Sequence, residues 1–213
     1  MTPSTPILPP RDREATRARL IAAVGTLLAR KGFKALGINA VAREAGVDKV
    51  LIYRYFGGLP QLIAAFGQEG DFWPSVSELA GGDPVAFGRL PLDERLRRLT
   101  RNFVAGIRRR PLTLEIMAWE TVERNELTAE LEMLRENTHL RLAEMFFPAG
   151  AGETDLQAVL GLIGAGLSYL ALRARDVRWY NGIDIQSSAG WRRIEAAVDQ
   201  IVAGLLSSTQ NIG

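Results

Sequence analysis

Long hydrogen-bond donors gather on a short stretch near the N-terminus, where Lys49 and Arg54 flank Tyr53. An ammonium or a guanidinium group can reach the acceptor atoms that guanine presents in the major groove of DNA. Tyrosine hydroxyls and lysines also bind phosphates, which position a protein on a duplex without reading its sequence. The chemistry that these residue types indicate is recognition of nucleic acid.

Two short helices are predicted to position these side chains. The stretch 38–45 has its apolar residues at helical spacing, and Gly46 follows where a left-handed residue can end a helix. Asp48 is a good N-cap for a second helix over 48–56, because its carboxylate accepts the free amide protons of the first turn. A helix, a tight turn and a second helix form the arrangement that places the second helix in a major groove.

This stretch resembles the N-terminal domain of TetR-type transcriptional regulators. The likeness rests on Gly32-Phe33, on the run Val-Ala-Arg-Glu-Ala-Gly-Val at 41–47 and on Ile-Tyr-Arg-Tyr-Phe at 52–56, and it covers about residues 13 to 62. It departs from the family pattern at Leu36-Gly37, where Ser or Thr is usual, and at 48–51, where Ser-x-Gly-Thr is usual. The run 57–60 also lacks the usual lysine. These departures make the DNA contacts particular to this chain.

The resemblance implies an all-α protein of about nine helices that acts as a homodimer on an operator in double-stranded DNA. It implies a flexible arm over 1–10, a three-helix DNA-binding head over 11–57, and an effector-binding and dimerisation body over 58–213. The resemblance also implies a cytoplasmic protein, most simply a repressor, whose DNA binding is controlled by a small and largely apolar effector. A DNA-binding protein without an effector is an alternative.

Contacts with DNA are predicted for eight residues of the head. Lys49 and Arg54 are predicted to contact base edges, because long donors reach guanine acceptors. Val50 and Leu51 are expected to touch thymine methyl groups. Contacts with phosphates are expected from Lys34, Tyr53 and Tyr55, and a contact with a base or a phosphate from Asn39. Tyr55 could instead be half-buried beside Phe56.

The distribution of charge agrees with a DNA-binding head. Residues 1–60 hold ten basic and four acidic side chains, a net charge of +6. The whole chain has 26 basic and 24 acidic residues, so residues 61–213 hold 26 − 10 = 16 basic and 24 − 4 = 20 acidic ones, a net charge of −4. A basic end on a mildly acidic body is typical of a protein that binds nucleic acid through one domain.

Helical periodicity continues through the body. Helices are expected over 13–31, from about 59, over 92–110, 112–124, 127–147, 156–172 and 189–206, with a short helix and a loop over 71–90. The run 156–172 has no charged residue, so it is either a buried helix or, less simply, a membrane span. Its pairing with 189–206 across a two-fold axis implies a four-helix dimer interface, and packing within one chain is the alternative. The interface residues expected are Leu156, Leu160, Ile163, Gly164, Leu167, Ile194, Val198, Ile201 and Leu205.

A ligand pocket is expected among the central helices. The body is larger than dimerisation requires, and its aromatic and sulfur-containing side chains should face inward, although most could be plain core. The resemblance implies a cavity for an apolar effector with a few polar anchors. The predicted lining residues are Asn102, Phe103, Glu115, Met117, Trp119, His139 and Tyr169.

Catalytic and metal chemistry find little support in the composition. The chain has no cysteine and one histidine, His139, so a typical zinc site is not possible. No Gly-x-Ser-x-Gly turn and no phosphate-binding loop occurs. The expectation is a protein that is not an enzyme, with no cofactor, no metal and no membrane. A helical enzyme with an incidental helix-turn-helix likeness is the rival hypothesis.

Overall fold

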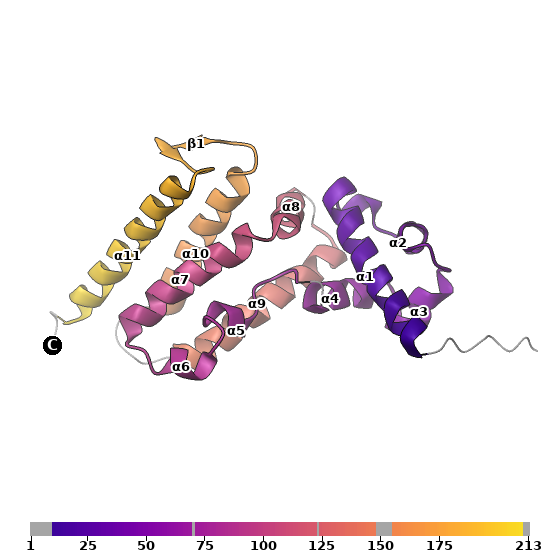
Figure 1. Ribbon diagram of the computed structural model, residues 1–213, viewed down its shortest axis with the longest axis horizontal. Coiled ribbons are helices and arrows are strands. Elements are labelled where there is room, and N and C mark those ends of the chain that lie inside the picture. Colours follow the sequence, from indigo (N-terminus) through magenta and orange to yellow (C-terminus); the bar gives the residue numbers. More distant parts are fainter. Residues whose placement is uncertain (1–9, 70, 123, 148–154, 211–213) are drawn as a thin grey trace, which may run out of the picture. The chain divides into compact units, whose positions relative to one another are not determined.

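The computed structural model describes residues 10–69, 71–122, 124–147 and 155–210, and these form an all-α fold (Figure 1). The predicted fold class is confirmed, with eleven α-helices in those ranges instead of about nine. The excess lies mainly in 71–90, where two short helices replace the single one expected. The predicted loop at 149–154 and all but the last residue of the predicted arm lie outside the described residues.

The helices follow the predicted order closely. Their bounds are α1 Pro10–Lys31, α2 Ile38–Ala45, α3 Val50–Phe56, α4 Leu59–Glu69, α5 Val76–Leu79, α6 Pro84–Gly88, α7 Leu92–Arg108, α8 Pro111–Glu120, α9 Glu126–Phe146, α10 Leu156–Arg173 and α11 Ser188–Gln210. A 3-10 turn, η1, spans Phe33–Ala35, and two short strands, β1 Trp179–Tyr180 and β2 Ile183–Asp184, precede α11.

The chain divides into two compact units, and the first carries the helix-turn-helix. This head unit comprises the described residues up to Phe72 together with 119–134, so it is larger than the predicted 11–57. Its centre is α1, which packs against α2 and α4, while α3 packs against α4. Apolar side chains from all four helices are buried there, namely Leu20, Val24, Leu28, Val41, Ile52, Leu62, Ile63 and Phe66.

A tryptophan from outside the first four helices completes the head unit. Trp119, at the end of α8, packs over Gly32, which has a positive φ of 68°. A Cβ atom on Gly32 would lie 2.7 Å from Cδ2 of Trp119, so this contact requires a glycine. The sequence prediction placed Trp119 in a ligand pocket, whereas the structure places it here.

The second unit comprises residues 73–118 and 135–213, as far as they are described. Within it α7 packs against both α10 and α11, and the three helices run side by side in Figure 1. An ion pair that is nearly buried fastens α5 to the end of α7, because Arg110 donates to both carboxylate oxygens of Glu78 at 2.7 and 2.6 Å. The helix predicted to run to residue 110 ends at Arg108, and this bond holds the segment just beyond its end.

A β-hairpin between α10 and α11 was not anticipated from the sequence. Strands β1 and β2 are antiparallel, and Asn181 and Gly182 form the turn with φ values of 47° and 74°. Both values are positive, as a type I′ hairpin turn requires. Trp191 of α11 anchors the hairpin, because its indole Nε1 donates to the carbonyl of Ile185 at 2.6 Å.

Helix α10 is buried on one side only within the described chain. Leu167 and Ala171 are its buried residues, while Leu162 is 77% and Tyr169 48% exposed. Among the described residues it is the one helix long and apolar enough to be considered a membrane span, and a single helix of this kind is weak support for one. It does not by itself indicate a membrane protein.

Candidate nucleic-acid interface and body cavity

The turn between α2 and α3 has the geometry that the sequence predicts. Gly46 ends α2 in the left-handed conformation, with φ 66° and ψ 37°, and the amide of Val47 donates to the carbonyl of Ala42 at 3.0 Å. This bond satisfies a carbonyl that the helix end would otherwise leave free. The next helix begins at Val50, two residues later than predicted, and its N-cap is Lys49 and not Asp48. Asp48 still supports the first turn, because its Oδ1 accepts from the amide of Val50 at 2.8 Å.

Helix α3 has one buried and one exposed side. Ile52 is fully buried, which fixes the rotation of this seven-residue helix against the head. On the other side Val50 is 59% and Tyr53 56% exposed, and both are large side chains. A short helix that is anchored at one point and exposes apolar and aromatic groups is suited to contact with bases and backbone.

Positive charge on this exposed side is available to a partner. Lys49 and Arg54 are exposed, and neither forms an ion pair with any residue that the structure describes. By contrast, Arg30 is paired with Glu44 at 2.8 Å, and Arg17 with Glu69. Hydrogen bonds within the latter pair raise the pKa of Arg17 and lower the pKa of Glu69. Lys49 and Arg54 therefore leave their charges available beside the exposed side of α3.

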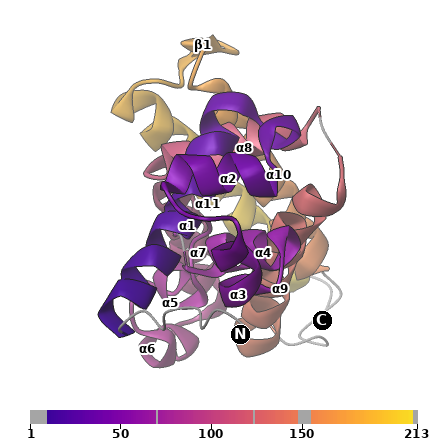
Figure 2. The same ribbon diagram turned by 90° about the vertical axis from the view of Figure 1, so that its right-hand side faces the viewer.

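The other predicted DNA contacts lie on or beside the two helices. Lys34 on η1 and Asn39 at the start of α2 are exposed, and Leu51 is half-buried. Tyr55 is half-buried as well, with the guanidinium carbon of Arg13 5.6 Å from its ring centroid. Figure 2 shows α2 and α3 together on the side of the head that faces the viewer. Whether these eight residues touch DNA stays a prediction.

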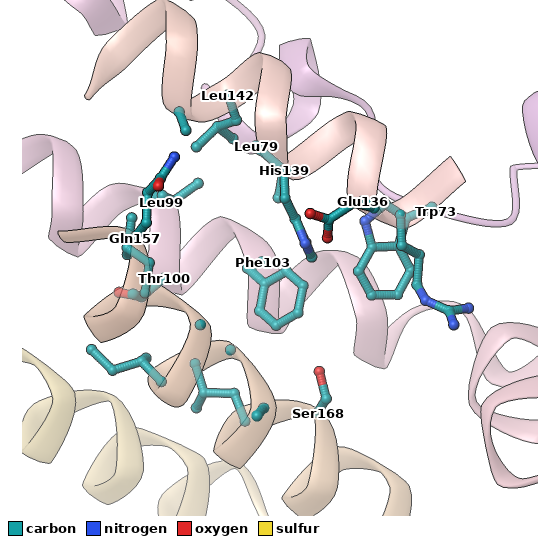
Figure 3. A pocket seen from close by; sticks show the side chains of 18 of the residues that line it. Trp73, Leu79, Leu99, Thr100, Phe103, Glu136, His139, Leu142, Gln157 and Ser168 are labelled. Atoms are coloured by element: carbon teal, nitrogen blue, oxygen red, sulfur yellow. The ribbon is translucent and has the colours of Figure 1, made fainter. Parts of the chain in front are cut away.

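A separate cavity of about 550 Å³ lies in the second unit, between α7, α9 and α10 (Figure 3). Its walls are mainly apolar, with Phe103 and Leu99 on α7 and Leu160 and Ile163 on α10. Glycines 161 and 164 leave room on α10, since a Cβ atom on either would meet nothing within 4 Å. A cavity of this size and character can hold a small apolar molecule.

Three of the seven residues predicted for a pocket line this cavity, namely Phe103, Met117 and His139. The other polar candidates have partners elsewhere. The amide of Asn102 donates to the carbonyl of Leu79 at 2.9 Å, and Glu115 is paired with Arg175. Tyr169 packs edge to face on Tyr180 of the hairpin, with ring centroids 5.9 Å apart.

The sequence prediction missed several polar residues of the cavity. Arg135 and Glu136 come from the same side of α9 as the predicted His139, and Gln157 and Ser168 come from α10. The spacing of 135, 136 and 139 puts them on neighbouring positions of a helix, a signal that was present in the sequence. Their nearness to Trp73, which precedes α5, depends on tertiary packing and was not readable.

The predicted dimer residues divide between two environments. Leu160, Ile163, Gly164 and Leu167 line the cavity of their own chain. Ile194 and Val198 are buried within the unit, where α11 packs against α7, and Leu156 and Leu205 are half-buried. Ile201 is exposed, as an interface residue of a separate chain would be. Their contact with a second copy stays a prediction.

Comparison with known proteins identifies the helix-turn-helix. Residues 20–66 match the family model described as bacterial regulatory proteins of the tetR family. A 55-residue segment is 42% identical to an HTH-type transcriptional repressor of Streptomyces coelicolor, and it spans 26% of this chain and 29% of that protein. The family model therefore covers the helix-turn-helix, and the curated match spans about a quarter of the chain.

Solved structures extend the likeness to the whole fold. A TetR family transcription regulator from Marinobacter aquaeolei is 19% identical, with a TM-score of 0.58 over 91% of this chain and 96% of that one. A TetR-like regulator from Rhodococcus sp. is 18% identical, with a TM-score of 0.59 over 94% and 99% of the two chains. The fatty acid degradation regulator FadR of Bacillus halodurans, at 15% identity, also gives 0.59 over 88% and 97%.

Fold and site together define a DNA-binding helix-turn-helix protein of the all-α regulator class. The chain is similar to TetR-family regulators in sequence over residues 20–66 and in fold over about nine-tenths of its length. These relatives are described as transcription regulators, which favours this class of function over the rival hypothesis of a helical enzyme. Among the described residues, no group of histidine and acidic side chains could hold a metal ion.

Proposed function

We propose that this protein is a ligand-responsive transcriptional repressor that binds a palindromic operator as a homodimer in the cytoplasm. The observation that carries the proposal is the exposed side of α3, where Lys49, Tyr53 and Arg54 stand beside Val50 in a matched TetR-type domain. The name of the Streptomyces relative, a repressor, supports the sign of regulation.

Base reading is assigned to Lys49 and Arg54, and contact with thymine methyl groups to Val50 and Leu51. Phosphate contacts are assigned to Lys34, Tyr53 and Tyr55, with Asn39 beside them. A two-fold dimer would read two half-sites about one helical turn, ~34–36 Å, or a multiple of that apart.

The proposed dimer contact uses the exposed sides of α10 and α11. Leu162 and Tyr169 on α10 and Ile201 on α11 are large apolar residues that this chain leaves in water. An apolar surface of this kind on a soluble protein marks an interaction site. A two-fold axis lets the same surface serve both partners, which is the commonest symmetry of homo-oligomers.

The cavity lined by Phe103, Met117 and His139 is the proposed effector site. An effector that binds one arrangement of the dimer more tightly than the other would change operator affinity. The coupling needed is about 1–3 kcal/mol, and DNA must weaken effector binding by the same factor.

Selection of binding sites from a random DNA pool tests the proposal. We expect the enriched sequences to be inverted repeats whose half-sites are about 10 base pairs or a multiple apart. Binding should weaken steeply with salt, because phosphate contacts release counterions. Enrichment of no sequence, or of single half-sites bound by a monomer, would overturn it. Operator binding that no small molecule alters would favour the second candidate, an effector-independent DNA-binding protein.

A further inference from the structure

Four polar side chains point into the cavity without a partner of their own. Glu136, His139, Gln157 and Ser168 line it, and none of them makes a hydrogen bond or an ion pair with another residue of the described ranges. Thr100 differs, since its hydroxyl donates to the carbonyl of Arg97 at 3.0 Å. Polar groups at an apolar cavity gain most from a ligand that bonds to them.

Two charged residues line the cavity, and they are not equivalent. The guanidinium of Arg135 lies over the indole of Trp73, 5.7 Å from the ring centroid. Glu136 has no such contact, and Figure 3 shows its carboxylate between the side chains of His139 and Trp73. Arg135 keeps its positive charge over the ring, but Glu136 is the charged residue of the cavity that no hydrogen bond, ion pair or ring contact within the described residues engages.

Aromatic rings surround this carboxylate. Trp73 meets Phe103 edge to face at 5.7 Å between centroids and meets His139 in the same manner at 5.8 Å. Rings of this kind attract a cation placed over their faces. Desolvation lowers the pKa of His139; the charge of Glu136 opposes this shift less strongly, and the charge of Arg135 adds a still smaller lowering. The imidazole is therefore neutral at pH 7 and does not repel a cation.

We propose that the cavity binds an amphipathic organic cation, a protonated amine on an apolar ring or chain, with the ammonium group at Glu136. The apolar part would extend along Phe103 and Ile163 into the space beside Gly164. Ser168 lines the cavity from α10, opposite α9, and offers a further oxygen to a ligand (Figure 3). This inference rests on the proposed effector role of the cavity and names its ligand class.

The test compares three ligands that share a body and differ in the head group, namely phenylbutylamine, phenylbutanol and phenylbutyrate. Dissociation constants are measured on the full-length protein by calorimetry at neutral pH. Because Glu136 is partly in water, we expect the amine to bind about three- to tenfold more tightly than the alcohol, with the acid weakest.

A pair of matched variants assigns the preference to one carboxylate. Glu136→Gln should bring the amine and the alcohol to within about twofold of each other, because the attraction of the charge is lost. Glu144→Gln removes an exposed carboxylate of the same helix that does not line the cavity, and it should leave the preference as it is.

Three outcomes overturn the inference: tightest binding of the acid, an amine preference that survives Glu136→Gln, or binding of none of the probes. Tightest binding of the acid would make Arg135 the anchor. Operator affinity measured with each probe distinguishes a failure of the proposed ligand class from a failure of the proposed regulatory function. An amine that binds at Glu136 but leaves operator affinity unchanged supports the inference and contradicts the regulatory role. If the acid binds most tightly and releases the protein from DNA, the regulatory function is supported and the proposed ligand class is contradicted.

Discussion

The DNA-reading stretch and the cavity differ in how much of the chain each one needs. The cap and exposed side of α3 come from the nine consecutive residues 48–56, and one buried side chain, Ile52, orients them. The cavity takes residues from five helices, α5 and α7–α10, and from Trp73. A local site is readable from spacing, whereas a site assembled from distant segments depends on which helix faces meet. The predictions below test that contrast.

The largest effect is expected from removing the anchor of α3. Ile52→Ala leaves a cavity at a fully buried position and should lower the free energy of unfolding of the head by about 2–5 kcal/mol. Hydrogen exchange should then accelerate in the head unit and not around the cavity, with loss of DNA binding. Val85→Ala, at a position 66% exposed, is the control and should change stability by less than about 0.5 kcal/mol. Equal acceleration in both units would contradict the contrast.

Loss of a base-reading side chain should act on DNA binding alone. Arg54→Ala is expected to cost about 1–3 kcal/mol on the selected operator and to relax specificity at one position of each half-site. Competition between operator and random duplexes measures both. Arg89→Ala removes an exposed arginine of the second unit and should be neutral. The same loss on every duplex would assign Arg54 to phosphate instead.

The turn before α3 should be sensitive to a single methyl group. Gly46→Ala places a Cβ atom at a φ of 66° and should cost about 1–2 kcal/mol, although no neighbour lies within 4 Å. Gly37→Ala is the matched comparison, because that residue is extended and its Cβ atom would also meet nothing. Urea unfolding curves should separate the two variants. Identical midpoints would mean that the left-handed conformation is not required.

The smallest effect concerns the cavity and pH. Since the pKa of His139 lies below its ordinary value of 6.5, the folded protein binds this proton more weakly than the unfolded chain does. Its contribution to stability is complete above about pH 6.5 and is lost as pH falls from there through the folded pKa. His139→Asn should therefore flatten the fall in Tm across this range. An unchanged slope would show that His139 titrates normally.

Sequence reasoning succeeded where neighbours along the chain determine structure. Gly46 and Asp48 predicted the turn because their conformational and capping roles are local. It failed on the hairpin, although Asn181-Gly182 after two aromatic residues is a strong hairpin signal. Each strand has only two residues, which is too short for the alternating pattern that predicts a strand.

The cavity shows a different limit. Periodicity identified α10 as an apolar helix but not which of its sides its own chain covers. Leu160, Ile163 and Leu167 were predicted for the dimer interface, and no periodicity indicated that they also line a cavity of their own chain. Likewise, Glu115 was predicted to bind the effector, but its carboxylate is paired with Arg175, which lies sixty residues further along the chain. Such pairings are set by tertiary packing, which no local pattern contains.

The anchored hairpin has a practical consequence. Ile185 is buried, and its carbonyl accepts a hydrogen bond from the indole of Trp191. At the turn, a Cβ atom on Gly182 would meet nothing within 4 Å. Trp179, 62% exposed, lies one residue pair from that turn. A fluorophore or a short affinity tag inserted between Asn181 and Gly182 would thus be held at a defined place on the surface. The hairpin is a ready attachment point for following this protein on DNA in single-molecule work.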